Sequence, residues 1–490
     1  MLCSQSRKIH QVKSLLIKSG RILKYPVMPP RLESHIFGGL QGYVGPDLEI
    51  LTDKHDARFH EYSKRWSDID RKVPAAIVLP RTEEQIQSTV HWAVKHSVPF
   101  VAKSGGHSTW STIGEEGFII DLSNYSGITV DSSGPVAKLR GSILSKAVAV
   151  HLAGNGYFAA IGNGTQVGAI PYFLNGGASI TTSLTGYGSD QIVAARMIDA
   201  QGDLVEITQE RQPDLLYAIR GAGQFFGLIT ELTIKVWPLT ELGNDNGVIW
   251  SGRFVFPMEM ALEVAQAMKY IVEDGTKATA GLLMTSCPPP ARKPALVVAA
   301  RYIGNPDDAT TAFSALYELK PIIADGGPVP IQNVSDGREA LEAKGGFKTF
   351  GTVGLRRFDI ERFLATIEVW KRLMEECPDA INTTFNFQWD SRPPKQPSFE
   401  SANSLHDIRF WQNNIIWYTD ASSHQKVAQL NAECIAIARG PDRSEYADFQ
   451  NATRTGPIEL RFRGKGKLEK LQSLKMKWDP EGVFTGQFMN

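Results

Sequence analysis

Clusters of glycine between residues 105 and 227 restrict the fold of this 490-residue chain more than any other feature of its sequence. They occur at Gly105-Gly106, in residues 162–168, at Gly176-Gly177, in residues 186–188 and in residues 221–227. Glycine has no Cβ, so a cluster lets the backbone come very close to whatever lies beside it. The clusters therefore predict repeated close approach of the backbone, either to a ligand or to another segment of the chain.

A strand–helix–strand unit is predicted ahead of the first glycine pair. Ala75–Leu79 is a short apolar run typical of a buried strand, and Thr82–Gln85 has the spacing of a capping box that begins a helix with one apolar face. The next strand, Val98–Ala102, runs directly into the loop Lys103–Ser108. The N–H groups of such a loop can hold a phosphate, although an ordinary tight turn explains the glycine pair equally well. His107 by itself is more often a packed or solvated residue than a reactive one.

The pattern of the chain changes near Pro238. Before it, Ile192–Ile198 and Leu204–Ile207 predict a hairpin, a short helix is expected from Asp214, and Leu228–Val236 alternates as a strand. After it, the glycine clusters thin out. Helices are predicted there at residues 257–274, 307–319 and 359–376, and strands at residues 282–285, 295–300, 383–389 and 414–418. Helices grouped against an antiparallel sheet give an α+β layer.

Charge, hydrophobicity and cysteine content exclude several classes of protein. Lys plus Arg and Asp plus Glu both number 52, so the chain has no global field that would attract nucleic acid or an anionic membrane. No apolar run approaches the ~18–20 residues that cross a bilayer. The 4 cysteines are scattered without a CxxC pair, which argues against a disulfide scaffold and a structural zinc site, and we expect no metal.

Every charged residue before Glu33 is basic. A basic, acid-free start is similar to an organellar presequence, but the same composition suits a disordered extension or an arm packed on the first domain. The apolar run Leu15–Ile17 is too short for the core of a secretory signal. We therefore expect an intracellular protein, and the compartment stays open.

A series of motifs occurs in one order along the chain. They are Pro74–Pro80, Lys103–Ser108, Gly176-Gly177, Gly186 with Asp190, Arg220–Gly227 and the tail Leu471–Phe484 with its Asp479-Pro480 stop. This order resembles the FAD-linked oxidases with a covalent flavin, of the vanillyl-alcohol-oxidase or PCMH type. Within them it is most similar to the berberine-bridge-enzyme-like, 6-hydroxynicotine-oxidase-like branch in its fungal form. The resemblance covers nearly all of the chain from about Leu51.

The resemblance implies an α+β fold. A PCMH-type FAD-binding domain of two subdomains would occupy residues 51–240, after an N-terminal extension over residues 1–50. An α+β substrate domain, with an antiparallel sheet covered by helices, would occupy residues 241–440. Residues 441–490 would return to the FAD-binding domain.

The resemblance also implies which residues hold FAD. His107 stands where the family joins its imidazole to the flavin. Many members add a second bond from a cysteine at the position of Gly164, so a single histidyl link is expected here. Val167 stands at the family's oxygen-gate position, in the small form associated with reaction with dioxygen. The other positions assigned to the pyrophosphate loop, the flavin and the ribityl chain are Lys103, Ser104, Gly105, Gly106, Ser108, Gly168, Gly177, Asp190, Gly227 and Ile229.

The substrate side departs from the family's pattern. A tyrosine that acts as the base in several members is replaced by Phe449, which cannot accept a proton. Tyr418 and Glu459 are our candidates for the base, although Glu459 could equally be a solvated or salt-bridged strand residue. The residues expected to face the flavin or the substrate are Phe385, Phe387, Gln388, Trp389, Trp417, Tyr418 and Phe449. Each of these aromatic residues could instead belong to the core.

Two functions from different classes follow. The first is an FAD-dependent oxidase of secondary metabolism that takes a hydride from a small or medium natural-product-like substrate and forms hydrogen peroxide from dioxygen. The second is a non-redox isomerase or cyclase with a structural flavin, which the loss of tyrosine at Phe449 favours. A flavin-binding protein without catalysis has no specific support. We expect a small-molecule substrate, no nucleic acid, and a monomer or homodimer.

Overall fold

The computed structural model describes residues 31–131, 134–448, 458–486 and 488 of the chain. The chain divides into two compact units, Met1–Arg31 and Leu32–Asn490, and every element named below belongs to the second. The presequence-like segment and Phe449 lie outside the described residues. Helix α2 (Ile36–Val44), which lies within the expected N-terminal extension, and strand β1 (Glu49–Leu51), which crosses its boundary at residue 50, both belong to this second unit. Among the described residues, no helix is long and apolar enough to cross a membrane.

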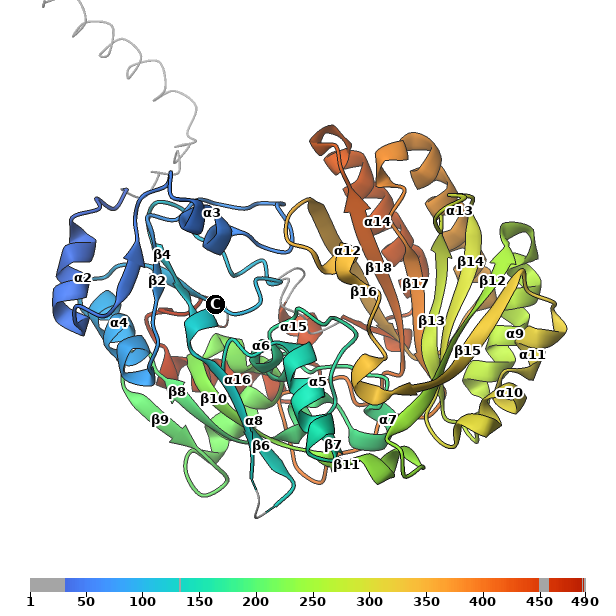
Figure 1. Ribbon diagram of the computed structural model, residues 1–490, viewed down its shortest axis with the longest axis horizontal. Coiled ribbons are helices and arrows are strands. Elements are labelled where there is room, and N and C mark those ends of the chain that lie inside the picture. The colour runs from blue at the N-terminus through green and yellow to red at the C-terminus, as the bar shows by residue number, and fades with distance from the viewer. Residues whose placement is uncertain (1–30, 132–133, 449–457, 487, 489–490) are drawn as a thin grey trace, which may run out of the picture. The chain divides into compact units, whose positions relative to one another are not determined.

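A mixed four-stranded sheet, in the order β1-β2-β4-β3, forms the first part of this unit (Figure 1). Its parallel strands are Ala76–Leu79 (β2), Phe118–Asp121 (β4) and Phe100–Lys103 (β3), and β1 is antiparallel to β2. Helix α4 (Glu83–Lys95) begins where the capping pattern predicted, because Thr82 Oγ1 accepts the N–H of Gln85 at 3.2 Å. The Gln85 side chain accepts the N–H of Arg81 at 2.7 Å instead of completing the box at Thr82.

An antiparallel five-stranded sheet follows, in the order β5-β6-β10-β8-β9. Its strands are Ser126–Val130 (β5), Val136–Gly141 (β6), Leu228–Lys235 (β10), Ile192–Ile198 (β8) and Leu204–Ile207 (β9). The predicted hairpin is confirmed, since β8 and β9 pair from Ile198 with Leu204. One hydrophobic core joins the sheet to helices α5 (Ser145–Gly154), α6 (Ala169–Leu174), α8 (Pro213–Ala222) and α16 (Lys467–Trp478). The last helix of the chain therefore packs on this early sheet.

The third sheet has eight antiparallel strands in the order β15-β12-β14-β13-β17-β18-β16-β19. They are Ile323–Pro330 (β15), Val248–Pro257 (β12), Ala295–Tyr302 (β14), Thr279–Ser286 (β13), Phe385–Asp390 (β17), Phe410–Tyr418 (β18), Phe347–Leu355 (β16) and Tyr446–Asp448 (β19). Helices α9 (Ala261–Glu273), α10 (Ala309–Ala312), α11 (Ser314–Glu318), α13 (Ile360–Glu376) and α14 (His424–Arg439) gather on one side of it (Figure 1). The expected antiparallel sheet covered by helices is confirmed.

Several elements of this layer have no clear sequence signal. Strand β15 reads Ile-Ala-Asp-Gly-Gly-Pro-Val-Pro, and glycine and proline are typical of turns. It lies at the edge of the sheet, where a proline without an N–H breaks no ladder on the open side. Strands β12 and β16 and helix α14 were likewise not predicted. The remaining short elements are α3 (Ala57–Ser63), β7 (Tyr157–Phe158), α7 (Thr182–Thr185), β11 (Trp237–Pro238), α12 (Glu339–Glu342) and α15 (Ile458–Arg461).

Candidate active site

A cavity of about 440 Å³ lies between the glycine-rich loops and the eight-stranded sheet. Its glycine-loop wall consists of Lys103–Ser108, Gly162–Gly164, Val167-Gly168, Gly177 and Gly227–Ile229. Its sheet wall consists of Leu282, Phe350, Thr352, Asn386, Gln388, Trp411, Asn413 and Ile415. Cavities of this size commonly hold cofactors and small molecules. Of the residues expected to bind a cofactor, the cavity gathers all but Asp190.

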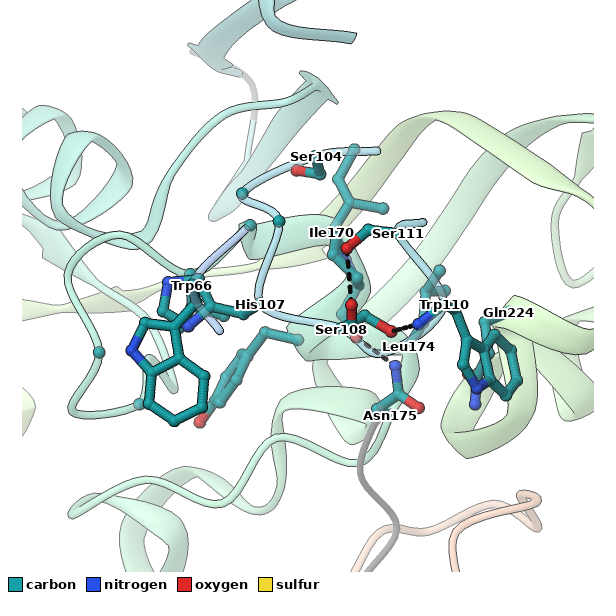
Figure 2. A pocket seen from close by; sticks show the side chains of 18 of the residues that line it. Trp66, Ser104, His107, Ser108, Trp110, Ser111, Ile170, Leu174, Asn175 and Gln224 are labelled. Carbon is teal, nitrogen blue, oxygen red and sulfur yellow. Dashed lines mark hydrogen bonds between the residues drawn. The ribbon is translucent and has the colours of Figure 1, made fainter. Parts of the chain in front are cut away.

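The loop after β3 is fixed by contacts of Lys103, the last residue of that strand. Lys103 is buried, and its Nζ pairs with Asp121 at 2.9 Å and donates to the carbonyl of Tyr62. Farther along, Ser108 Oγ accepts the N–H of Trp110 at 3.0 Å (Figure 2). The charge of Lys103 is therefore already neutralised inside the protein, and this residue supports the loop.

The glycines of the two loops allow a contact of backbone on backbone. A β-carbon at Gly105 would lie 2.5 Å from the carbonyl oxygen of Gln166 and 2.7 Å from the nitrogen of Gly168. A β-carbon at Gly168 would collide with Ser104 Oγ. The sequence left open whether the glycines approach a ligand or another segment. Here they approach another segment, and together the two loops form one surface that lines the cavity.

His107 lies in the cavity against a stack of aromatic rings (Figure 2). Its imidazole is stacked on Trp66, with ring centroids 5.4 Å apart and an interplanar angle of 15°. Trp66 stacks in turn on Phe350, at 4.9 Å and 11°. Burial, with the positive charges of Lys348 and Lys344 nearby, lowers the pKa of His107 to about 4. The imidazole is therefore neutral near pH 7, the form in which one ring nitrogen keeps its lone pair.

The connection between β15 and β16, residues 331–346, joins the two walls. The buried Glu342 accepts the N–H groups of Thr165-Gln166 at 2.8 and 3.0 Å. The carbonyl of Leu341 accepts the indole N–H of Trp66 at 2.8 Å. The glycine loop and the aromatic stack beside His107 are thus both fixed by a segment that belongs to the sheet.

Polar atoms on both walls are buried without a hydrogen-bond partner among the described residues. On the glycine side they are Ser104 Oγ, Asn175 Oδ1 and Gln224 Oε1, and on the sheet side both amide atoms of Asn386. Each such atom costs about 1–3 kcal/mol when it stays unpaired. They indicate a ligand with hydrogen-bonding groups along its length. A backbone surface made by glycines with polar side chains beside it fits the FAD that the resemblance implies.

Asp190 takes no part in the cavity, which corrects its expected place beside the flavin. Its carboxylate accepts the N–H of Tyr187 at 2.9 Å and pairs with His406 Nε2 at 3.0 Å. The carboxylate closes the turn after Gly186, whose β-carbon would lie 3.0 Å from Asp190 Oδ2. Asp190 therefore fixes the glycine turn against a distant segment.

Alternation along β17 and β18 decides which side chains reach the cavity. On β17, Asn386 and Gln388 line it, whereas Phe385, Phe387 and Trp389 belong to the core beneath the helices. On β18, Trp411, Asn413 and Ile415 line it. The expectation that Phe385, Phe387, Trp389 and Tyr418 face the flavin is therefore corrected, because all four belong to the core beneath the helices. Trp417 is in phase with the cavity-lining residues of β18 but does not itself line the cavity, and of the described residues in the expected set Gln388 alone lines the main cavity.

Of the two candidate bases, Tyr418 is placed differently from the expectation, and the position of the Glu459 side chain stays untested. Tyr418 is 1% exposed, stacks on Phe347 at 5.2 Å and shares a hydrogen bond with His424 Nδ1. Burial raises the pKa of Tyr418 to about 12, and the residue does not line the cavity. Glu459 belongs to helix α15, not to a strand, and its side chain lies outside the described part of the chain.

Other residues of the cavity were missed by the sequence. Asn386 could have been found by stepping two residues back from Gln388 along one strand face. Trp66, Phe350 and Arg338 also line the cavity, but they come from a loop, an unpredicted strand and a connection without periodicity.

Residues 74–208 match the FAD binding domain family. The chain is also similar to fungal proteins named FAD-linked oxidoreductases. It is 28% identical to hasG of Aspergillus fumigatus, over 89% of this chain and 96% of that protein. It is 29% identical to afoF of Emericella nidulans, over 90% of this chain and 92% of that one.

Solved structures share the fold at lower identity. Wild-type Physcomitrella patens BBE-like 1 aligns with a TM-score of 0.78 at 15% identity, covering 92% of this chain and 99% of that one. The 6-hydroxy-D-nicotine oxidase of Arthrobacter nicotinovorans aligns at 0.77 and 19%, covering 89% and 96%. Glucooligosaccharide oxidase of Acremonium strictum, described with 6-S-cysteinyl, 8α-N1-histidyl FAD, aligns at 0.74 and 18%, covering 92% and 98%.

Proposed function

We propose that this chain, which is an FAD-linked oxidoreductase with its FAD binding domain at residues 74–208, is an oxidase of secondary metabolism. It takes a hydride from a small or medium natural-product-like substrate, and dioxygen becomes hydrogen peroxide. FAD, when bound, supplies the hydride acceptor and the electron transfer to dioxygen. The observation that carries the proposal is one cavity with a glycine-loop wall that includes His107 on one side and an aromatic and amide-bearing sheet wall on the other.

The glycine-loop wall is the proposed FAD site. Its backbone surface at Ser104–Gly106 and at Val167-Gly168 presents no side chain larger than valine and serine to the cofactor. Gly177, Gly227 and Ile229 extend this surface, and the unpartnered Asn175 Oδ1 and Gln224 Oε1 lie beside it as hydrogen-bond acceptors. Lys103 and Asp190 hold the loops in place, as the ion pair of Lys103 with Asp121 and the hydrogen bonds of Asp190 to Tyr187 and His406 indicate.

A single covalent link at His107 is part of the proposal. The neutral imidazole is the nucleophilic form, and stacking on Trp66 fixes its orientation in the cavity. Gly164 lines the cavity at the position of the family's second link, but a β-carbon there would lie 2.6 Å from Val167 Cγ2. A cysteine at residue 164 would therefore need Val167 to move, which supports one bond.

The described residues of the cavity offer little to remove a proton. Tyr172 donates its hydroxyl to the carbonyl of Ala178 at 2.7 Å, and burial raises its pKa. Glu342 already accepts two backbone N–H groups of the glycine-loop wall. We therefore keep Glu459 as the proposed base for an alcohol or phenol, whereas a neutral amine would need no base.

The non-redox isomerase or cyclase stays the second candidate. Phe449 favours it, because phenylalanine stands where the resembling family often places its proton acceptor.

Anaerobic titration with fractionated fungal metabolite extracts distinguishes the two functions. The oxidase predicts that the flavin absorbance bleaches with substrate and returns with air, with one hydrogen peroxide formed per oxygen consumed. Conversion of a metabolite without bleaching and without oxygen uptake would contradict the oxidase and support the isomerase or cyclase.

A further inference from the structure

Among the described residues that line the cavity, Arg338 is a cationic side chain that no described carboxylate contacts. It precedes helix α12 in the connection at residues 331–346 and lines both the main cavity and a small cavity beside it. Within the described ranges, no carboxylate or carbonyl accepts a hydrogen bond or ion pair from its guanidinium. Lys103, the other cation of the lining with a fixed charge, is paired with Asp121. An arginine has five N–H donors, and those of Arg338 meet no acceptor among the described residues, so they are available to a ligand.

Among the described residues, neither Arg338 nor the neighbouring Arg301 makes a direct contact with a carboxylate. Arg301 lines the small cavity and donates to the carbonyl of Ala300 at 2.9 Å, a neutral partner. Burial, with the like charge of Arg338 nearby, lowers the pKa of Arg301 to about 10. Burial also lowers the pKa of Arg338, which the negative charge of Glu342 partly offsets, but the carboxylate oxygens of Glu342 accept hydrogen bonds from residues 165 and 166.

Asp390, a further carboxylate near Arg338 and Arg301, accepts hydrogen bonds from other residues. Asp390 lines the small cavity and accepts the N–H groups of Ser183 at 3.2 Å and Arg392 at 3.0 Å. Burial raises the pKa of Asp390 to about 6, so it is only weakly held in its charged form. The guanidinium groups of Arg338 and Arg301 are therefore left without a carboxylate in contact, and an anion from outside the described chain would be such a partner.

The side chains shared by the two cavities describe the ligand further. Besides Arg338 they are Asn163, Gln388, Leu282 and Trp411, which we call together the Arg338 corner. The two amides can donate to the same oxygen atoms that the guanidinium binds, and the apolar pair can cover a flat body. Guanidinium matches a carboxylate in a bidentate geometry, and such charge-assisted bonds are stronger than neutral ones.

We propose that the Arg338 corner binds a carboxylate on the substrate, so that the enzyme acts on flat, apolar molecules that carry a carboxylic acid. This inference rests on the proposed function, because it takes the bound molecule to be the substrate of that reaction. The binding of a carboxylate at Arg338 does not itself need turnover. Arg338 binds and orients one end of the molecule, and the reacting group lies elsewhere on it.

Calorimetric titration of the flavin-loaded enzyme with 2-naphthoate, 2-naphthamide and 2-naphthol tests the proposal. These probes share one flat body and differ in the group that would meet Arg338. Naphthoate should bind about 10- to 100-fold more tightly than the amide, the range that charge-assisted bonds give. In Arg338→Gln this preference should fall below about threefold, and Arg338→Lys should keep part of it. Arg253→Gln removes an exposed arginine of β12 that pairs with Asp325 of β15, and this control should keep the full preference for naphthoate.

Two results would overturn the proposal: equal affinity of wild type for naphthoate and naphthamide, or unchanged naphthoate affinity in Arg338→Gln. Naphthol binding as tightly as naphthoate through Arg338 would overturn the carboxylate and indicate a phenolate. If Arg338→Gln loses its flavin, Arg338→Lys decides, since wild-type affinity there contradicts the proposal. The oxidase is tested separately, by the anaerobic titration with metabolite extracts. The naphthalene probes have no C–H that can leave as hydride, so their binding tests Arg338 alone, and either proposal can fail while the other stands.

Discussion

The glycine-loop wall and the sheet wall enclose the same cavity, but the first presents backbone and the second presents side chains. Gly105 and Gly168 lie against the neighbouring loop so closely that a single methyl group has no room. On the sheet wall, Asn386 and Gln388 reach the cavity only because of their place in the alternation of β17. A backbone surface leaves a mark in the sequence, because only glycine allows it. A surface made of side chains on a sheet cannot be recognised in the sequence until it is known which face of each strand lines the cavity.

The largest expected effect separates the two candidate bases. If Glu459 removes the substrate proton, Glu459→Gln should lower kcat/KM for an alcohol or phenol by a factor on the order of 10²–10⁴. Tyr418→Phe should leave kcat/KM close to wild type, because Tyr418 lies in the core beneath the helices with His424 as its partner. Steady-state kinetics of both variants check this. A large loss in Tyr418→Phe would show that the sheet wall is assigned to the wrong strand face, and an unchanged rate in Glu459→Gln would remove the carboxylate from the account.

The backbone character of the glycine-loop wall can be broken by one methyl group. Gly105→Ala should destabilise the protein by ~3 kcal/mol or more, since its β-carbon would meet backbone atoms of residues 166 and 168 that cannot turn away. The flavin content should fall with it. Gly42→Ala is the matched control, because the residue lies in helix α2 with nothing within 4 Å of a β-carbon. Chemical denaturation and the ratio of flavin to protein absorbance measure both, and wild-type values for Gly105→Ala would contradict the close approach of the loops.

The stability of the protein should depend on pH through Asp390, which lies at the end of β17 beside the sheet wall. Burial raises the folded pKa of this carboxyl from 3.8 to about 6. The folded state therefore holds a proton that the unfolded chain has lost, and Asp390 lowers stability as pH rises through this interval. The penalty is absent below about pH 4 and complete above about pH 6, on the order of 3 kcal/mol.

Asp390→Asn removes this titration. Relative to wild type, the variant should gain stability between pH 4 and pH 6 and keep the gain above it. Urea unfolding at a series of pH values measures the difference. A constant difference across the interval would show that Asp390 is ionised in the folded protein at low pH.

The smallest expected effect concerns the proposed oxygen gate on the glycine-loop wall. Val167 lines the cavity, and its carbonyl is held by the N–H and hydroxyl of Ser145 at 2.9 and 3.0 Å. Val167→Leu should slow reoxidation on the order of tenfold, the low end of the effect of one methylene in a packed site. Anaerobic reduction by substrate should stay nearly unchanged. Stopped-flow mixing with air-saturated buffer checks this, and equal reoxidation rates would remove Val167 from the proposed function.

The fold and the glycine-loop wall were largely predictable, and the reason is local. The strand–helix–strand unit and the hairpin of Ile198 with Leu204 follow from periodicity within one segment. The loop at Lys103–Ser108 and the glycines at residues 168, 177 and 227 stand out in the sequence itself. Asp190 did not follow, because its hydrogen bonds to a distant His406 decide which way it points.

The sheet wall was mostly not predictable, and the reason is long-range. Phe385 and Trp389 are aromatic residues in the right strand, yet they face the core, and Asn386 between them faces the cavity. Which face of β17 is covered depends on helices far away in the chain, which the pattern of one strand does not contain. Trp66 and Arg338 come from loops, where no periodicity applies.

Acid precipitation tests the central claim, FAD joined to His107 by one bond, most directly. The wild-type protein should give a yellow pellet and a colourless supernatant, whereas His107→Ala, if it binds flavin at all, should release it completely into the supernatant. Peptide mapping of the wild-type pellet should find the flavin only on the peptide that contains His107. Complete release of flavin from the wild type, or a yellow pellet from His107→Ala, would contradict the account.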